Sequence, residues 1–183
     1  SRSGTGSALE QTQTLIEAIP ALLARVGAGS LLDIPCGDFH WLSVADLGVD
    51  YTGADIVQDL VDANNRLYGS AGRRFVRLDL TADPLPRASV VLCRDCLVHL
   101  SFANIRRALA NIRASGAEYV LMTHFALTEE NLEAEDGDWR SLNFTLPPFN
   151  LPPPLESIVE NCGEDGGAYS DKSLSLWRTA DLG

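Results

Sequence analysis

Lysine is almost absent from this chain of 183 residues, in which Lys172 is the single lysine among 14 basic residues. We attribute this bias toward arginine to the base composition of the gene rather than to anion binding. Acidic residues number 25, so the formal net charge is −11. A surface this acidic repels phosphate backbones, and nucleic acid is therefore an unfavoured partner.

Long hydrophobic runs are also missing. The longest apolar run falls well short of the roughly 20 residues that cross a bilayer. No charged and then apolar segment at the N-terminus indicates export. We therefore expect one cytoplasmic domain of ordinary globular composition, without a membrane partner. The oligomeric state is left open.

Metal and redox motifs are incomplete. The chain has four cysteines, of which Cys93 and Cys96 form a C-x-x-C. No second C-x-x-C is present to complete a zinc site. Cys93 also ends an apolar run typical of a buried strand, where a thiol packs as a small hydrophobe. We interpret the cysteines as structural and expect no metal, a divalent cation held by imidazoles and carboxylates being the minor alternative.

Strand-like and helix-like segments alternate along most of the chain, which predicts a parallel sheet covered on both faces. Strands are expected at 30–34, 51–54, 74–78, 89–93 and 119–123, and helices at 7–26, 57–68 and 101–115. Ser7 and Glu10 form a capping-box pattern at the start of the first helix. Pro20 is expected to kink this helix or split it in two.

The last third of the chain does not continue this alternation of strands and helices. Residues 128–154 have little periodicity, and so long a loop is either functional or closes the core with its aromatic side chains. Residues 155–161 and 173–178 flank a turn-rich segment, which predicts a β-hairpin. A short helix at 154–162 is the alternative.

An acid stands at the end of each of the first four expected strands, namely Asp33, Asp55, Asp79 and Asp95. Ligands of open α/β sheets bind outside the carboxyl ends of the strands. Asp55 is placed to accept ribose hydroxyls, and Asp79 is placed to receive the amino group of a purine. One such acid more often caps a helix, but four in series indicate a nucleotide-like ligand. The first strand also runs into a Pro-Cys-Gly-Asp turn, which brings backbone amides close to such a ligand.

In this order and spacing the segments resemble the class I S-adenosylmethionine-dependent methyltransferases. LDIPCGDF at 32–39 resembles the first motif of that family, and YTGAD at 51–55 resembles the motif of the second strand. RLDL at 77–80 resembles the adenine-contacting segment, and CRDCLVHL at 93–100 the motif of the fourth strand. The resemblance implies an α/β, Rossmann-like three-layer sandwich with a mostly parallel seven-stranded sheet and an antiparallel last strand. It also implies S-adenosyl-L-methionine as cofactor and S-adenosyl-L-homocysteine as product.

The first motif departs from the family pattern, because Pro35 and Phe39 stand where glycines are usual and only Gly37 is kept. The small-residue head at 3–7 is therefore a candidate to fold over the cofactor, a disordered tail being the alternative. We expect a single domain, 1–183, with an N-terminal helical cap at 1–29 and a cofactor-binding core at 30–126. An acceptor-side loop at 127–154 and a terminal strand pair at 155–179 complete it.

The resemblance and the chemistry together assign the site. The cofactor-binding residues are expected to be Asp33, Pro35, Cys36, Gly37, Asp55, Ile56, Asp79, Leu80, Arg94 and Asp95. The candidates for a base that takes the proton of the acceptor are Asp95, His99 and His124. Asp95 and His99 are four residues apart and would share a face if a helix had begun there. The alternative is that Asp95 caps the helix and His99 packs beneath the cofactor. The expected acceptor-binding residues are Trp139, Arg140, Asn143 and Phe149.

Aromatic, arginine and amide side chains suit a polar small molecule. We therefore expect O-methylation of a sugar or a hydroxylated natural product. N-methylation of a small molecule or peptide, a nicotinamide-dependent oxidoreductase on the same sheet, and a catalytically silent cofactor-binding module are the alternatives. The absence of G-x-G-x-x-G after the first strand weighs against the nicotinamide cofactor.

Overall fold

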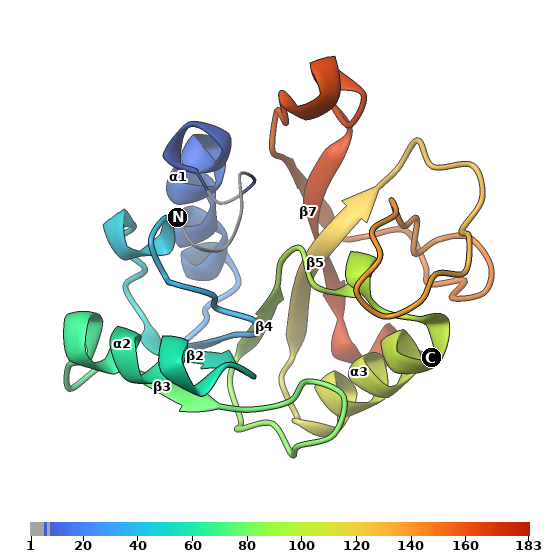
Figure 1. The fold of residues 1–183 in the computed structure, drawn as a ribbon. Helices are drawn as coiled ribbons and strands as arrows, with labels where there is room; N and C mark the ends of the chain where they lie inside the picture. Colours follow the sequence, from blue (N-terminus) through green and yellow to red (C-terminus); the bar gives the residue numbers. More distant parts are fainter. Residues whose placement is uncertain (1–5, 7) are drawn as a thin grey trace.

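The computed structural model describes residue 6 and residues 8–183, and its strands form one seven-stranded sheet in the order β3-β2-β1-β4-β5-β7-β6 (Figure 1). Adjacent strands are parallel from β3 to β5, and β7 is antiparallel to both β5 and β6. The predicted sheet and the terminal hairpin are thereby confirmed, and the alternative helix at 154–162 is wrong. The strands are β1 (Ser30–Asp33), β2 (Asp50–Asp55), β3 (Arg73–Arg77), β4 (Val90–Cys93), β5 (Tyr119–Phe125), β6 (Glu156–Val159) and β7 (Lys172–Arg178).

Three α-helices are found among the described residues: α1 (Leu9–Arg25), α2 (Gln58–Tyr68) and α3 (Phe102–Ala114). Pro20 stands inside α1, which continues through it, so the predicted split of this helix is wrong. The predicted cap Ser7 and most of the head segment lie outside the described residues. Among those that are described, no helix is long and apolar enough to span a membrane.

The helices divide between the two faces of the sheet, which makes the predicted three layers (Figure 1). Successive side chains of a strand point to opposite faces, so Leu31 and Leu32 enter different cores. One core lies between the sheet and α1 with Val61 of α2, and the other lies between the sheet and α3. The apolar residues of α1 recur at helical spacing, and its buried face consists of Thr12, Leu15, Ile19, Leu22 and Leu23.

The segment after β1 forms no α-helix, only the short 3₁₀ helix η2 (Leu42–Val44). Phe39, which stands where the resemblance leads us to expect a glycine, is buried with its ring centroid 4.8 Å from that of Tyr51 and 5.2 Å from those of Tyr68 and Phe75. Its φ of 56° lies in the left-handed region, as does the φ of 54° at Gly37. The aromatic side chain at this position therefore anchors the turn to the core.

The long loop between β5 and β6 covers the α3 face of the sheet in place of a helix. Its side chains Leu142 and Phe144 are fully buried. The Asn131 amide donates to the carbonyls of Asn143 and Pro147 at 2.8 Å each, and Asn131 Oδ1 accepts from the Asn143 N–H at 2.8 Å. These bonds satisfy the backbone of a loop that has no regular hydrogen-bonding partner.

Candidate functional site

A pocket of about 250 Å³ opens at the carboxyl ends of β1, β2 and β4. Seven of the ten residues predicted to bind cofactor line it: Asp33, Pro35, Cys36, Gly37, Asp55, Arg94 and Asp95. Asp38, Trp41 and Leu60 complete the lining. The strand order reverses between β1 and β4, which is where an open α/β sheet binds its ligand.

Backbone amides hold the Asp55 carboxylate at the rim of this pocket. The Gly37 N–H donates to Asp55 Oδ2 at 3.0 Å, and the Val57 N–H donates to Asp55 Oδ1 at 3.0 Å. The Cys36 N–H donates to the Ala54 carbonyl at 2.8 Å, which ties the first turn to β2. Each carboxylate oxygen can accept a further hydrogen bond, so Asp55 can still receive hydroxyl groups of a ligand.

Asp33 is the most deeply buried acid of the pocket, with 4 % of its surface exposed. Burial raises its pKa to about 7, against a lowering contribution from the Tyr51 hydroxyl that donates to Oδ2 at 2.6 Å. The nearby Asp55 raises the pKa further, and Arg94 lowers it. A cation entering the pocket would favour the ionised form of Asp33.

Arg94 and Asp95 belong to a network of four charged side chains. The Arg94 guanidinium donates to both oxygens of Glu160, at 3.2 Å from Nε and 2.7 Å from Nη2. The Lys172 ammonium donates to Asp95 Oδ2 at 2.7 Å. Burial acts to raise the pKa of Asp95, but the charges of Arg94 and Lys172 outweigh it and hold the pKa below its ordinary value.

Two members of this network, Glu160 and Lys172, were not predicted from the sequence. Both lie on the terminal hairpin, far along the chain from the motifs that indicate the pocket. The one feature of the sequence that could have drawn attention to Lys172 is that it is the single lysine of the chain. The Arg94 guanidinium also lies 5.4 Å from the ring of Trp41 and donates to the Gly6 carbonyl at 2.9 Å. Gly6, the one described residue of the head, therefore lies beside the pocket.

Three of the predicted cofactor residues do not line the pocket. The side chain of Ile56 is exposed after β2, and that of Leu80 is buried in the core on the α3 face. Asp79 Oδ1 accepts from the N–H and the hydroxyl of Thr81, at 2.8 and 2.7 Å. One carboxylate oxygen of Asp79, the residue predicted to bind the purine, is thus used to close a local turn.

The condition under which Asp95 and His99 would share a helical face is not met. Asp95 has a φ of 51°, and the short 3₁₀ helix η3 (Leu97–His99) begins only after it. The two residues therefore do not share one α-helical face. The Asp95 carboxylate contacts Lys172 instead, and His99 Nδ1 lies 3.2 Å from the Asp138 carbonyl oxygen.

His124 lies in the core on the α3 face rather than in the lining of the pocket. Its Nδ1 accepts from the Phe144 N–H at 3.3 Å, and its ring packs against those of Phe144 and Trp177. Burial lowers its pKa, against an opposing attraction from Asp171. This arrangement explains His124 as a packing and hydrogen-bonding residue.

The predicted acceptor-binding residues are mostly occupied by contacts within the protein. Arg140 donates to the carbonyls of Leu97, Val98, Leu100 and Leu132. The Asn143 amide donates to the carbonyls of Ala126 and Thr128, and Phe149 packs against Phe102 and Phe144. These contacts favour the alternative in which the loop closes the core. Trp139 differs, because 43 % of its surface is exposed beside Tyr169 and Phe125.

The described residues contain no group of three or more histidine, cysteine or acidic side chains able to hold a metal ion. The C-x-x-C holds two neighbouring thiols, of which Cys93 is buried in β4. A hydrogen bond with the Cys96 side chain, together with burial, raises the pKa of Cys93 well above its ordinary value. A thiol of this kind is a poor nucleophile and a poor metal ligand.

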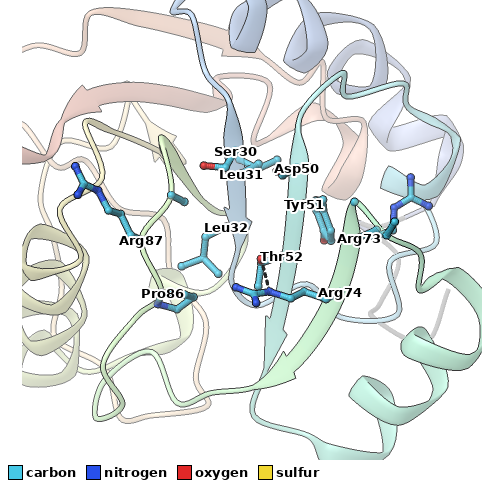
Figure 2. A pocket seen from close by; sticks show the side chains of 13 residues that line it. Ser30, Leu31, Leu32, Asp50, Tyr51, Thr52, Arg73, Arg74, Pro86 and Arg87 are labelled. Carbon is cyan, nitrogen blue, oxygen red and sulfur yellow. Dashed lines mark hydrogen bonds between the residues drawn. The ribbon is translucent and has the colours of Figure 1, made fainter.

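A second hollow, of about 330 Å³, lies at the opposite edge of the sheet, where β1, β2 and β3 begin (Figure 2). Arg73, Arg74 and Arg87 are among its lining residues, and Arg74 Nε donates to the Thr52 hydroxyl at 3.2 Å. None of the four acids at the strand ends lines it. The candidate site is therefore the smaller pocket at the carboxyl edge.

The strand order, the antiparallel β7 between β5 and β6, and the pocket at the carboxyl ends of β1, β2 and β4 define the fold of the class I methyltransferases. No family model and no curated protein matches the sequence. Solved structures match the fold at low sequence identity.

Human N-acetylserotonin methyltransferase in complex with S-adenosylmethionine is similar to this chain with a TM-score of 0.63 at 15 % identity, over 93 % of this chain and 55 % of that one. An O-methyltransferase family protein from Burkholderia thailandensis has the same TM-score at 12 % identity, over 93 % and 56 %. The methyltransferase domain of bacterial CtHen1 has a TM-score of 0.55 at 16 % identity, over 62 % and 66 %. The chain thus spans little more than half of the first two proteins.

Proposed function

We propose that this protein is an S-adenosylmethionine-dependent methyltransferase whose acceptor is a small polar molecule, with O-methylation of a sugar or a hydroxylated natural product as the reaction. The observation that carries the proposal is the pocket at the carboxyl ends of β1, β2 and β4, in which the Gly37 N–H donates to the Asp55 carboxylate. The structural neighbours support the same class of reaction.

The charge of the pocket fits this donor. S-adenosylmethionine carries two positive charges near one carboxylate, and the pocket is lined by Asp33, Asp38, Asp55 and Asp95 against the single cation Arg94. Fixed carboxylates in a partly buried pocket attract a cationic ligand more strongly than they would in water. Asp55 would receive the ribose hydroxyls, as the family resemblance implies.

When bound, the donor supplies an activated methyl group that an in-line displacement transfers to the acceptor. The protein has to align the two molecules, exclude water and, for a hydroxyl acceptor, take a proton. Among the three candidate bases, Asp95 is a weak base because its pKa is lowered, and His124 is buried in the core.

His99 fits the role of the base better than the other two. If its Nδ1–H donates to the Asp138 carbonyl at 3.2 Å, then Nε2 keeps a free lone pair for the proton of the acceptor. Trp139, which keeps an exposed surface, is the most accessible of the predicted acceptor-binding residues.

Binding and turnover test the proposal separately. Calorimetry with S-adenosylmethionine, S-adenosylhomocysteine and NAD should show binding of the first two alone. Asp55→Ala should weaken this binding by about tenfold or more, as loss of a charged hydrogen-bonding partner does. Asp50→Asn, an exposed acid in the opposite hollow, is the control and should leave it unchanged.

A panel of sugars, phenols, amines and peptides with labelled methyl donor then identifies the acceptor. Preferential binding of NAD would instead support the oxidoreductase. Binding of the methyl donor without transfer to any member of the panel would support a silent cofactor-binding module. Loss of turnover in His99→Ala, with donor binding retained, would assign the base.

A further inference from the structure

Two buried charged residues of the terminal hairpin, Glu160 and Lys172, lie at the edge of the candidate site. Because β7 is antiparallel to β5, its first residue, Lys172, pairs with Phe125 at the carboxyl end of β5. Glu160 follows β6 directly, and its N–H donates to the Lys172 carbonyl at 2.9 Å. Both residues therefore lie at the carboxyl ends of the parallel strands, the edge of the sheet at which the pocket is found.

These charges are unusually well buried. The side chains of Glu160, Arg94 and Lys172 are 1 %, 5 % and 7 % exposed, whereas that of Asp95 is 30 % exposed. Burying ion pairs gains little stability, since apolar side chains of the same size often serve as well. A buried network that borders a pocket is therefore more readily explained by function than by stability.

The contacts of Asp95 show how the network acts on the pocket. Asp95 Oδ2 accepts from Lys172 Nζ at 2.7 Å and lies 3.2 Å from Arg94 Nη1. The Asp95 N–H donates to the Thr123 hydroxyl at 2.8 Å, while Oδ1 lies 3.4 Å from the same hydroxyl. Oδ2 thus contacts two cations, Lys172 and Arg94, whereas Oδ1 can still accept a hydrogen bond from a ligand.

We propose that Lys172, oriented by Glu160, is a positioning residue that keeps the Asp95 carboxylate ionised and turned toward the pocket, where it accepts a cationic group of the bound ligand. This inference rests on the proposed function for the nature of that ligand, the amino group of the methyl donor. Lys172 acts through Asp95 and does not itself touch the ligand.

Asp95 has titratable and charged neighbours on every side. These are Cys93, Arg94 and Cys96 on its own connection, Glu160 and Lys172 on the hairpin, and Asp33, Asp38 and Asp55 across the pocket. Burial opposes its ionisation, and the charges of Arg94 and Lys172 favour it. Removing the charge of Lys172 therefore leaves Arg94 as the remaining cation in contact with Asp95.

A titration of the unliganded protein tests the inference without reference to any ligand. The carboxyl carbon of Asp95, followed by NMR, should titrate below the ordinary range of an aspartate in the wild type. Lys172→Gln, which keeps a polar side chain without the charge, should move the midpoint upward, and Lys172→Arg should restore it. A wild-type Asp95 that titrates in the ordinary range would overturn the inference, even if no variant folds.

Binding of S-adenosylhomocysteine provides the second readout. Lys172→Gln should weaken it by about tenfold or more, because one member of a buried charge pair is lost. Lys172→Arg should stay within about threefold of the wild type, since the cation is kept. Glu156→Gln is the matched control, because Glu156 lies on the same hairpin but pairs with Arg25 at the surface, and it should leave the affinity unchanged.

The two experiments fail in distinguishable ways. A wild type that binds neither S-adenosylmethionine nor S-adenosylhomocysteine overturns the proposed function, while the NMR titration still decides whether Lys172 controls Asp95. A folded Lys172→Gln variant with wild-type affinity and an unchanged Asp95 titration overturns the positioning role alone.

Discussion

The hydroxyl of Tyr51 on β2 donates to Asp33 Oδ2 on β1 across 2.6 Å, and both side chains are buried on the α1 face of the sheet. The bond stabilises the ionised carboxylate, yet burial prevails and raises the pKa of Asp33 to about 7. The site therefore contains an acid that changes charge near neutral pH.

Asp33 should make the unliganded protein less stable as the pH rises. Between the ordinary value of 3.8 and about 7, the folded state holds a proton that the unfolded chain has lost, so the free energy of unfolding falls over this window and levels off above it. Asp33→Asn should remove this slope and raise the stability at pH 8, while its amide oxygen still accepts from Tyr51. Urea unfolding at pH 5 to 8 measures both proteins, and equal slopes would contradict the assignment.

The same acid predicts the pH dependence of donor binding. The affinity for S-adenosylmethionine should rise as the pH passes through about 7, because the ionised form of Asp33 attracts the cationic ligand. The ionised Asp95 adds no slope in this range, since its pKa is lowered. Calorimetry across pH 6 to 8 should give a flat profile for Asp33→Asn. A wild-type profile that is equally flat would exclude this role.

His124 should affect stability rather than turnover. His124→Asn keeps an acceptor for the Phe144 N–H, whereas His124→Leu leaves that group without a partner, at a cost of about 1–3 kcal/mol. Because burial lowers the pKa of His124, the wild type should lose stability as the pH falls below the ordinary value of 6.5, relative to His124→Asn. A large loss of turnover in a stable His124→Asn variant would restore the predicted role as a base.

Arg140 should stabilise the long loop between β5 and β6. Its guanidinium binds the carbonyls of Leu97 and Val98 within η3, of Leu100 just after it and of Leu132 on the loop. Arg140→Ala leaves these acceptors unpaired and should lower the free energy of unfolding by about 1–3 kcal/mol. Thermal unfolding measures this loss, with the exposed Arg87→Ala as the control. Unchanged stability combined with a raised KM for the acceptor would support the substrate-binding role instead.

A side chain at position 53, in place of Gly53, should destabilise the protein. A Cβ at this position would lie 2.6 Å from Phe75 Cδ1 and 3.0 Å from Tyr51 Cε1, under the rings that anchor Phe39. Gly53→Ala should therefore cost about 1–3 kcal/mol. Gly29→Ala, whose Cβ would meet nothing closer than Ser89 Oγ at 4.0 Å, should change the stability by less than about 0.5 kcal/mol. Equal stabilities of the two variants would contradict the predicted clash.

The sheet and the position of the pocket could be predicted because both depend on local patterns. Apolar runs that end in an acid mark the carboxyl ends of strands, and the turn after β1 contains Gly37. Parallel strands bring those ends to one edge, so Asp33, Asp55 and Asp95 were expected together and do line one pocket. The terminal hairpin followed from two short apolar strands on either side of a turn-rich segment.

The roles of the long loop and of the histidines could not be predicted in the same way. A histidine after a buried strand has the same sequence signature at a site and in a core, and only the packing of His124 against Phe144 and Trp177 distinguishes the two. Likewise, nothing local to Arg140 reveals that its donors are taken by backbone carbonyls.

By itself, the sequence determined the order of the strands and helices, the acids at the strand ends and the edge of the sheet at which the candidate pocket lies, because periodicity and turn chemistry act over a few residues. Tertiary structure decided which charges meet there. Lys172 and Asp95 are 77 positions apart and come into contact only because β7 runs antiparallel beside β5. Burial then gave Asp33 a raised pKa and, with the two cations, Asp95 a lowered one, a difference that depends on neighbours from distant parts of the chain.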